Sequence, residues 1–298
     1  MMKTCTLIIG YIVFFSMFTF LAYTGVCNEA IPKPSFFYVG GTGLENYTSI
    51  QDAINYASAG STIIVFNGTY YEHVVVNKTI SLMGEKKNQI IIDGDNTGWV
   101  VRITADHVQI SGFTIQHSGS VFPDAGIAVH STYNTISDNI LTDNYYGMVL
   151  LSPASHNLIT QNTIAHNHRC GIYFSGASYN TLIGNHVDHQ PFNGFGLYDF
   201  SNDNTIVGNT LSYNNYSGVN IRESYRNNVT QNTFIGNKRG LHVPPPEFNT
   251  RFCGNFFSGN CISLEEERDY FPVSQVSFGI LLLIGFFVIK RWIAPKRR

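Results

Sequence analysis

The chain has 298 residues, a length that allows one or two domains. Its formal net charge is −2 and only 13% of its residues are charged, while hydrophobic residues make up 44%. These values argue against nucleic acid as a partner, because a nucleic-acid-binding protein typically has a basic face. They also argue against an intrinsically disordered chain.

The N-terminal residues 1–27 have the features of an export signal. Lys3 supplies a short positive region, and residues 7–23 are mostly apolar. This order predicts a signal peptide, or an uncleaved signal anchor because the apolar core is long for a signal. The small residues Thr24 and Gly25 favour cleavage near residue 27.

Residues 49–59 have the periodicity of a helix. Ser49 is a suitable N-cap and Gly60 a suitable stop. We expect a short helix that lies over the first rung of the structure that follows. Strands are expected next at residues 62–66, 74–76 and 80–83, and residues 107–115 then enter a regular repeat.

The middle of the chain repeats with a period of about 23 residues. One asparagine column is spaced by 23, 23, 24, 23 and 23 residues and contains Asn139, Asn162, Asn185, Asn209, Asn232 and Asn255. Two further columns keep the same register: Asn144, Asn167, Gln190, Asn214, Asn237 and Asn260, and then Asn134, Asn157, Asn180, Asn204, Asn227 and Thr250. Between these columns lie short segments rich in β-branched residues, which suit strands and are too short for helices.

A period of this length with three short strands predicts an all-β fold, a single-stranded right-handed parallel β-helix of about nine rungs. Neighbouring rungs lie about 4.8 Å apart, so equivalent side chains stack directly on one another. Stacked asparagine amides can hydrogen-bond along a column, which gives the asparagine ladder a structural role. The apolar columns then fill the interior. We assign residues 28–261 to this domain.

The C-terminal residues are predicted to anchor the protein. Residues 262–271 are expected to form an acidic stalk that includes Glu265. Residues 272–292 just reach the length of about 20 residues that a membrane-spanning helix needs, and the basic tail 293–298 should stay in the cytoplasm. Both ends thus predict a single-pass cell-membrane protein whose β-helix domain is extracellular or periplasmic. The alternative for the apolar segment is a buried core helix, for which a solenoid has little room.

Two groups of motifs resemble known families. The opening SIQDAINYASAGSTIIVFNGTYYEHVVVNKTISLMGE is similar to the start of pectin-lyase-like β-helix domains. The repeats YNTISDNILTDN, HNLITQNTIAHN, YNTLIGNHVDHQ and DNTIVGNTLSYN resemble those of the NosD-like family, and the resemblance covers about residues 45–260. It implies a right-handed parallel β-helix and either copper association in the periplasm, carbohydrate binding or sugar hydrolysis. Similar repeats are abundant on archaeal surface proteins. The motifs of the polygalacturonases and alginate epimerases are absent, and the calcium site of the pectate lyases has no clear counterpart.

One outward column of the repeat contains candidate metal ligands. It consists of His117, Asp143, His166 and His189, followed by Tyr213. Two imidazoles about 5 Å apart on adjacent rungs could share one ion, and imidazole suits copper and other divalent metals such as zinc or nickel. The alternatives are a solvated stack of polar residues, which we favour, and acid–base catalysis.

A second feature is a group of aromatic and arginine side chains beside the second asparagine column. The predicted carbohydrate-binding residues are Tyr145, Tyr146, Arg169, Phe192, Tyr213 and Tyr216, with Arg239 close to them. Flat rings along a solenoid can stack on sugar rings, with arginine as a hydrogen-bond partner. The alternative is simple packing of the turns between rungs.

Covalent modification is expected in an oxidising compartment. Cys253 and Cys261 are close enough in sequence to form a disulfide, or they are two free thiols. Five sequons could carry glycans, although such triplets also arise by chance in a chain rich in asparagine and threonine: Asn46, Asn67, Asn77, Asn215 and Asn228.

Three functions remain open from the sequence. The first is a membrane-anchored extracellular module that binds or displays at the cell surface, with polysaccharide or cell-envelope glycan as its ligand. The second is a polysaccharide-modifying enzyme, a lyase, hydrolase or epimerase, with an unrecognised catalytic set. The third is a copper-handling protein of the NosD type, although no Met-rich or Cys-rich copper motif is present.

Overall fold

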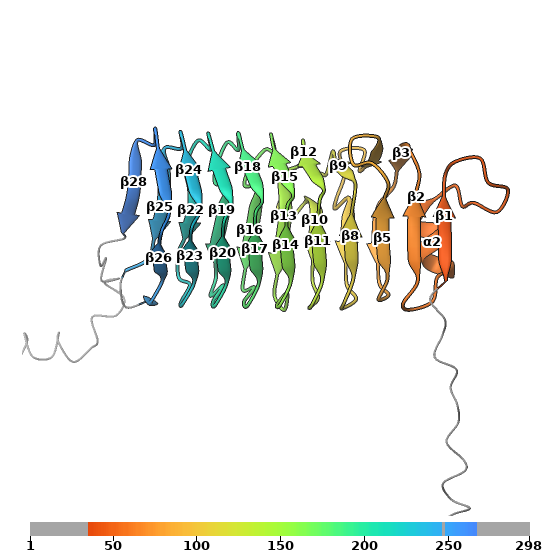
Figure 1. Ribbon diagram of the computed structural model, residues 1–298, viewed down its shortest axis with the longest axis horizontal. Helices are drawn as coiled ribbons and strands as arrows, with labels where there is room; N and C mark the ends of the chain where they lie inside the picture. The colour runs from red at the N-terminus through yellow and green to blue at the C-terminus, as the bar shows by residue number, and fades with distance from the viewer. Residues whose placement is uncertain (1–34, 246–247, 267–298) are drawn as a thin grey trace, which may run out of the picture. The chain divides into compact units, whose positions relative to one another are not determined.

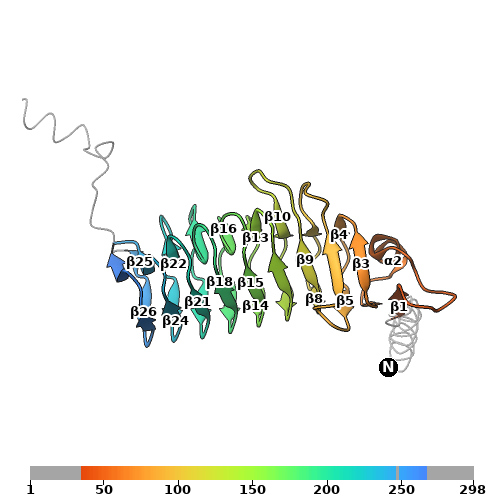
Figure 2. The ribbon, with the colours of Figure 1, turned by 90° about the horizontal axis from the view of Figure 1, so that it is seen from above.

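The computed structural model describes residues 35–245 and 248–266, which form a right-handed parallel β-solenoid of about ten turns (Figure 1). Each turn contributes one strand to each of three parallel sheets. Every strand pairs with the strand one turn earlier and the strand one turn later, so the sheets run along the solenoid axis. Figure 2 shows this succession from above. The fold predicted from the repeat is therefore confirmed.

We name the three sheets A, B and C. Sheet A has ten strands: β1 (Phe36–Val39), β2 (Thr62–Val65), β5 (Ser81–Gly84), β8 (Gln109–Ser111), β11 (Thr135–Ser137), β14 (Leu158–Thr160), β17 (Thr181–Ile183), β20 (Thr205–Val207), β23 (Asn228–Thr230) and β26 (Arg251–Cys253). Sheet B has nine: β3 (Gly68–Tyr71), β6 (Ile90–Asp93), β9 (Thr114–Gln116), β12 (Ile140–Thr142), β15 (Thr163–Ala165), β18 (His186–Asp188), β21 (Thr210–Ser212), β24 (Thr233–Ile235) and β27 (Phe256–Ser258). Sheet C also has nine: β4 (Val74–Val76), β7 (Val101–Ile103), β10 (Ala125–Val129), β13 (Tyr146–Leu151), β16 (Ile172–Ser175), β19 (Phe195–Tyr198), β22 (Ser217–Ile221), β25 (Arg239–Val243) and β28 (Ile262–Glu266).

The core is built from aliphatic stacks inside the three sheets. Because side chains alternate between the two faces of a strand, one residue in two points inward. In sheet A the inward residues Ile136, Ile159, Leu182 and Ile206 pair in register and are fully buried. The outward residues of sheet A are half-buried or exposed, as in most of sheet B.

The asparagine columns form continuous hydrogen-bonded ladders at the corners between sheets. Asn162 Nδ2 donates to Asn185 Oδ1 at 3.0 Å and to the Ile136 carbonyl at 2.9 Å, while the backbone N–H of Asn162 donates to the same Asn185 Oδ1 at 3.0 Å. Asparagine suits this place because its short amide can satisfy backbone groups at a corner where the ladder of strand hydrogen bonds is interrupted.

A single α-helix is found among the described residues, α2 (Ile50–Tyr56), which lies at the same end as β1 (Figure 2). Ser49 caps it as predicted, with its side chain accepting a bond from the Asp52 N–H at 3.2 Å. The helix ends before the predicted residue 59. Ala57 is already extended, and Lys78 Nζ donates to the carbonyl of Ala57 at 2.8 Å and to those of two preceding residues. A cation that binds free C-terminal carbonyls stabilises the helix end at this point.

The structure extends the solenoid at both ends beyond the prediction. Residues 36–39 form β1, a strand that the sequence analysis did not anticipate, and residues 262–266, assigned to a stalk, form β28 paired with β25. The predicted signal segment 1–27, the membrane helix 272–292 and the basic tail lie outside the described residues. Among the residues described, no helix is long and apolar enough to cross a membrane.

Candidate functional site

The outer face of sheet C differs from the outer faces of sheets A and B because most of its side chains are buried. All residues of β10 and β22 are buried, inward and outward alike. A second apolar cluster lies here, outside the solenoid core, and includes Ala128, Tyr146 and Val149. The loop before β10 covers one end of it, where Trp99 Nε1 donates to the Pro123 carbonyl at 2.8 Å.

A row of tyrosines crosses this face from one turn to the next. The rings of Tyr146 and Tyr173 lie 5.1 Å apart, and those of Tyr173 and Tyr198 lie 5.2 Å apart and are stacked. Gly196 makes room for Tyr198, because a Cβ at residue 196 would lie 2.6 Å from the tyrosine ring. Burial raises the pKa of Tyr146 to about 12 and raises the pKa of Tyr198 further still, so both phenols are protonated.

A chain of hydrogen bonds continues from Tyr198 along the face. Asn193 Nδ2 donates to the Tyr198 hydroxyl at 2.8 Å, and Asn220 Nδ2 donates to it at 3.3 Å. The Oδ1 of Asn220 lies 2.8 Å from Nδ1 of His242. Since a carbonyl oxygen only accepts, Nδ1 carries the proton and Nε2 is the free base of the neutral ring. Burial, followed by nearby Arg222, lowers the pKa of His242 and favours this neutral form.

An ion pair closes the chain at the C-terminal end of the face. Arg239 Nε contacts Glu265 Oε2, and His242 Nε2 lies 3.8 Å from the same carboxylate oxygen. Glu265 belongs to β28, so the residue assigned to a stalk forms part of this face. The carboxylate partly offsets the effect of the arginines on His242.

The buried polar atoms on this face without a hydrogen-bond partner among the described residues include Asn193 Oδ1 and Ser217 Oγ, whose side chains are fully buried. They lie on successive turns, in the same outward column as Tyr146 and Cys170. Leaving a buried polar atom unpaired costs about 1–3 kcal/mol, and an internal water is the usual partner of such an atom. Burial raises the pKa of Cys170 to about 11, which keeps its thiol protonated and unreactive.

Most of the predicted carbohydrate-binding residues lie beside this face. Arg169 lies 5.9 Å from the ring centre of Tyr145 and 5.5 Å from that of Phe192, and the rings of Phe192 and Tyr216 stack at 4.9 Å. Arg239 then lies 4.7 Å from the ring centre of Tyr216. The set joins the tyrosine row directly, because the ring of a fifth predicted residue, Tyr146, lies 5.0 Å from that of Tyr145.

Tyr213 and the predicted metal ligands belong to a different column, at the corner between sheets B and C. Tyr213 stacks on His189 at 5.3 Å, and the tilted rings of His189 and His166 also lie 5.3 Å apart. Each residue of this column has a positive φ, between 52° and 58°, and immediately precedes a residue of the second asparagine column or its continuation. The backbone turn beside the ladder therefore explains why these residues line up.

The predicted ligands do not assemble into a metal site. His117 Nδ1 pairs with Asp93 at 2.8 Å, His189 Nδ1 pairs with Asp188 at 2.7 Å, and the carboxylate of Asp143 accepts a bond from the Thr142 hydroxyl at 2.9 Å. Within residues 35–245 and 248–266, no group of three or more histidine, cysteine, aspartate or glutamate side chains has the geometry to hold a metal ion. The side chains of this column therefore do not fit a copper centre.

The predicted disulfide is absent, because Cys253 and Cys261 are both free and exposed. Cys253 is the last residue of β26 in sheet A, whereas Cys261 follows β27 in sheet B. The whole of strand β27 therefore lies between the two cysteines. Among the sequons, Asn67, Asn77 and Asn215 are exposed, while Asn46 and Asn228 are half-buried.

Sequence reasoning missed the central residues of the outer face of sheet C: Tyr173, Asn193, Tyr198, Ser217, Asn220 and His242. One signal could have found them. In sheets A and B the outward positions hold mostly small or polar residues such as threonine, whereas one outward position of the third strand changes in chemistry from turn to turn: Ala128, Val149, Tyr173, Gly196, Asn220 and His242. A position that varies in chemistry inside a strict repeat indicates a surface adapted to a ligand.

The solenoid with one specialised face places the protein among the parallel β-solenoids. Residues 54–271 match the family described as periplasmic copper-binding protein (NosD), and because the match covers most of the chain, the protein belongs to the NosD family. No curated protein matches the sequence at a significant level.

Several solved structures share the fold at low sequence identity. The A-module of the mannuronan C-5 epimerase AlgE6 from Azotobacter vinelandii is 14% identical, with a TM-score of 0.53 over 72% of this chain and 73% of that one. Pectate lyase Pel9A is 13% identical, with a TM-score of 0.51 over 83% of both chains. The catalytic domain of a GH87 alpha-1,3-glucanase in complex with nigerose is 14% identical, with a TM-score of 0.56 over 78% of this chain and 46% of that one. At this identity the likeness establishes the fold alone.

Proposed function

We propose that the outer face of sheet C binds a saccharide. The observation that carries this proposal is the stacked pair of half-buried rings, Tyr173 and Tyr198, which Tyr146 joins to Tyr145 beside the exposed guanidinium of Arg169. A sugar presents apolar C–H faces to aromatic rings and hydroxyl groups to polar atoms, so it satisfies both halves of the face at once. The solved structures with this fold include proteins named for mannuronan and alpha-1,3-glucan, which agrees with a glycan ligand.

The test is binding of the purified domain to a glycan array, followed by calorimetry with the best ligand. Tyr173→Ala should reduce the affinity at least tenfold, because it removes the middle ring of the row. Tyr213→Ala is the matched control, since it removes an exposed ring from the other column and should leave the affinity unchanged. Equal losses in both variants, or no glycan binding at all, would refute the proposal.

A second candidate function is a polysaccharide-modifying enzyme acting at the same face. It is favoured by the bonded series Tyr198–Asn220–His242, which holds a half-buried, protonated phenol and a buried, neutral imidazole on one face of sheet C. Such a pair could act as general acid and general base. Release of reducing ends or unsaturated sugars from a polysaccharide, abolished by His242→Gln while binding persists, would establish this activity. Binding without any product would leave the first function alone.

We also propose that the protein acts outside the cytoplasm, exported by residues 1–27 and held at the membrane by residues 272–292. The two apolar segments and the basic tail support this orientation. In intact cells, added protease should remove the β-solenoid epitope, and deletion of residues 272–298 should release the domain into the medium or periplasm. Retention of the truncated protein in the membrane would argue against this anchor.

A further inference from the structure

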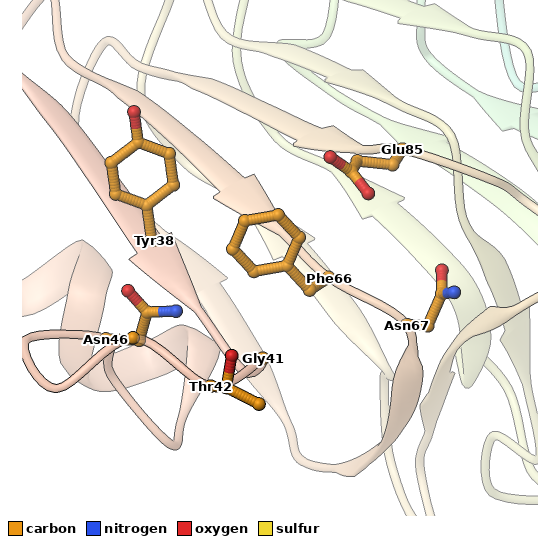
Figure 3. A pocket seen from close by; sticks show the side chains of 8 residues that line it. Tyr38, Gly41, Thr42, Asn46, Phe66, Asn67 and Glu85 are labelled. Carbon is orange, nitrogen blue, oxygen red and sulfur yellow. The ribbon is translucent and has the colours of Figure 1, made fainter.

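A separate pocket lies on the outer face of sheet A at its N-terminal end, away from sheet C (Figure 3). Its volume is about 570 Å³, within the range of pockets that bind small ligands. Strand β1 and the segments that follow β1 and β2 supply most of its wall. The lining residues are Tyr38, Gly41, Thr42, Gly43, Asn46, Phe66, Asn67 and Glu85.

The floor of the pocket is an aromatic platform. The rings of Tyr38 and Phe66 are stacked, with centroids 6.0 Å apart and planes within 8° of each other. The Tyr70 hydroxyl donates to the Phe66 carbonyl at 2.8 Å, which fixes the backbone that carries the second ring. Tyr38 remains 41% exposed, so its ring is accessible to a ligand.

Two of the five sequons open onto this single pocket. Asn67 is exposed, and in the view of Figure 3 the Phe66 ring lies between Asn67 and Tyr38. Asn46 lines the opposite side, but it is half-buried and its Nδ2 donates to the Gly40 carbonyl at 2.5 Å. Asn67 Nδ2 donates only an exposed hydrogen bond, to Gln89 Oε1 at 2.8 Å. Asn67 is therefore the more accessible of the two asparagines for attachment of a glycan.

We propose that Asn67 is N-glycosylated and that the first sugars of its glycan rest on the Phe66–Tyr38 platform. The attached chain would shield both rings from water, and its hydroxyl groups could bond with the Glu85 carboxylate and the Thr42 hydroxyl at the rim. In the attachment step, the amide nitrogen of Asn67 displaces the lipid-linked phosphate from C1 of an activated glycan. The C1–O bond breaks, the N–C1 bond forms, and the amide proton leaves with the phosphate.

Thr69 offers matched variants, because it is the third residue of the sequon and its side chain is exposed in β3. Thr69→Ala destroys the sequon without touching Asn67 or the platform, whereas Thr69→Ser keeps it. The full chain is produced in a secretory eukaryotic host and its glycopeptides are analysed by mass spectrometry. Asn67 should be occupied in the wild type and in Thr69→Ser, and unoccupied in Thr69→Ala. An unmodified Asn67 in molecules that carry glycan on exposed Asn77 would overturn the proposal.

The platform is tested by combining these variants with Tyr38→Ala. With Tyr38 present, glycosylated Thr69→Ser should melt about 2–4 °C above Thr69→Ala, the shift expected for about 1 kcal/mol in a domain of this size. With Tyr38→Ala, the difference should largely disappear. The same four proteins made in a bacterial host that adds no glycan give the intrinsic effect of serine against alanine.

Two results would overturn the role of the platform. One is an equal glycan-dependent difference in melting temperature with and without Tyr38. The other is tight binding of a free oligosaccharide to the unglycosylated Thr69→Ala protein that Tyr38→Ala abolishes, which would make the pocket a site for an external sugar. Neither result depends on the saccharide-binding face of sheet C, so the two proposals stand or fall separately.

Discussion

Two groups of fully buried polar side chains behave differently in this solenoid. Asn185, in a corner ladder, donates to Asn209 Oδ1 and to the Ile159 carbonyl, both at 2.9 Å, and its Oδ1 accepts two bonds from Asn162. Asn193, on the outer face of sheet C, has an Oδ1 with no partner. A residue whose bonds are all made within the protein stabilises the fold. Asn193 is not satisfied by the residues stacked on it, so its place in the fold has a different basis.

The difference follows from the repeat. A ladder asparagine sees the same neighbour on the turn above and the turn below, so one geometry satisfies every member. The outward column of sheet C reads Tyr146, Cys170, Asn193, Ser217 and Arg239 on successive turns. No two neighbours match, and the column therefore cannot satisfy itself by stacking.

The largest expected effect is on the ladder. Asn185→Ala leaves the backbone N–H and Nδ2 of Asn162 without their acceptor and the Ile159 carbonyl without a donor, so we expect the free energy of unfolding to fall by about 3 kcal/mol. Chemical denaturation measures this loss. The exposed Asn88→Ala should change it by less than about 0.5 kcal/mol. A loss below about 1 kcal/mol for Asn185→Ala would mean that the ladder is not what holds the turns together.

This contrast also explains how far the sequence could be interpreted. The ladders were predictable because an identical residue every 23 positions fixes the register, and the register fixes which residues stack. Five of the six predicted carbohydrate-binding residues lie together for the same reason, since their spacing follows the repeat. Tyr213 was wrongly grouped with them. It immediately precedes the ladder residue Asn214 at a corner, where a shift of one residue changes the direction in which the side chain points.

The polar chain of sheet C was not predictable in the same way. Tyr198 reaches Asn193 and Asn220 only because Gly196 lets its ring fold back along the strand, and this depends on a side-chain conformation that no periodicity specifies. Glu265 was assigned to a stalk because β28 lies beyond the last asparagine, where the sequence repeat has already ended.

A smaller effect should appear in the pH dependence of stability. Burial lowers the pKa of His242 below the value near 6.5 that it regains on unfolding. The unfolded chain therefore binds the proton more readily, and the contribution of this residue to stability is complete above about pH 6.5 and is lost as the pH falls through the folded pKa. In His242→Gln, stability should fall less between pH 7.5 and pH 5. Parallel profiles for the two proteins would show that His242 is not held neutral.

A still smaller effect on stability is expected at the unpartnered atoms. Ser217→Ala removes a buried hydroxyl that makes no bond, so the free energy of unfolding should stay within about 0.5 kcal/mol of the wild type or rise. Its affinity for the saccharide should equal that of the wild type, because the hydroxyl is fully buried. If Ser217→Ala is as destabilising as Asn185→Ala, the hydroxyl has an internal partner and the contrast between the two regions fails.

The least change is expected in the histidine column, which the family description would favour as a copper site. The rings of His166 and His189 lie 5.3 Å apart, but each histidine has its position because the turn before a ladder residue requires a positive φ. His189 is also bound to Asp188, and three ligands do not converge there. The double variant His166→Ala with His189→Ala should therefore bind Cu²⁺ as the wild type does in a calorimetric titration of the purified domain. If the wild type instead has a stoichiometric Cu²⁺ site that the double variant lacks, the histidine column is a functional site like the outer face of sheet C. The asparagine ladder would then align metal ligands as well as join the turns.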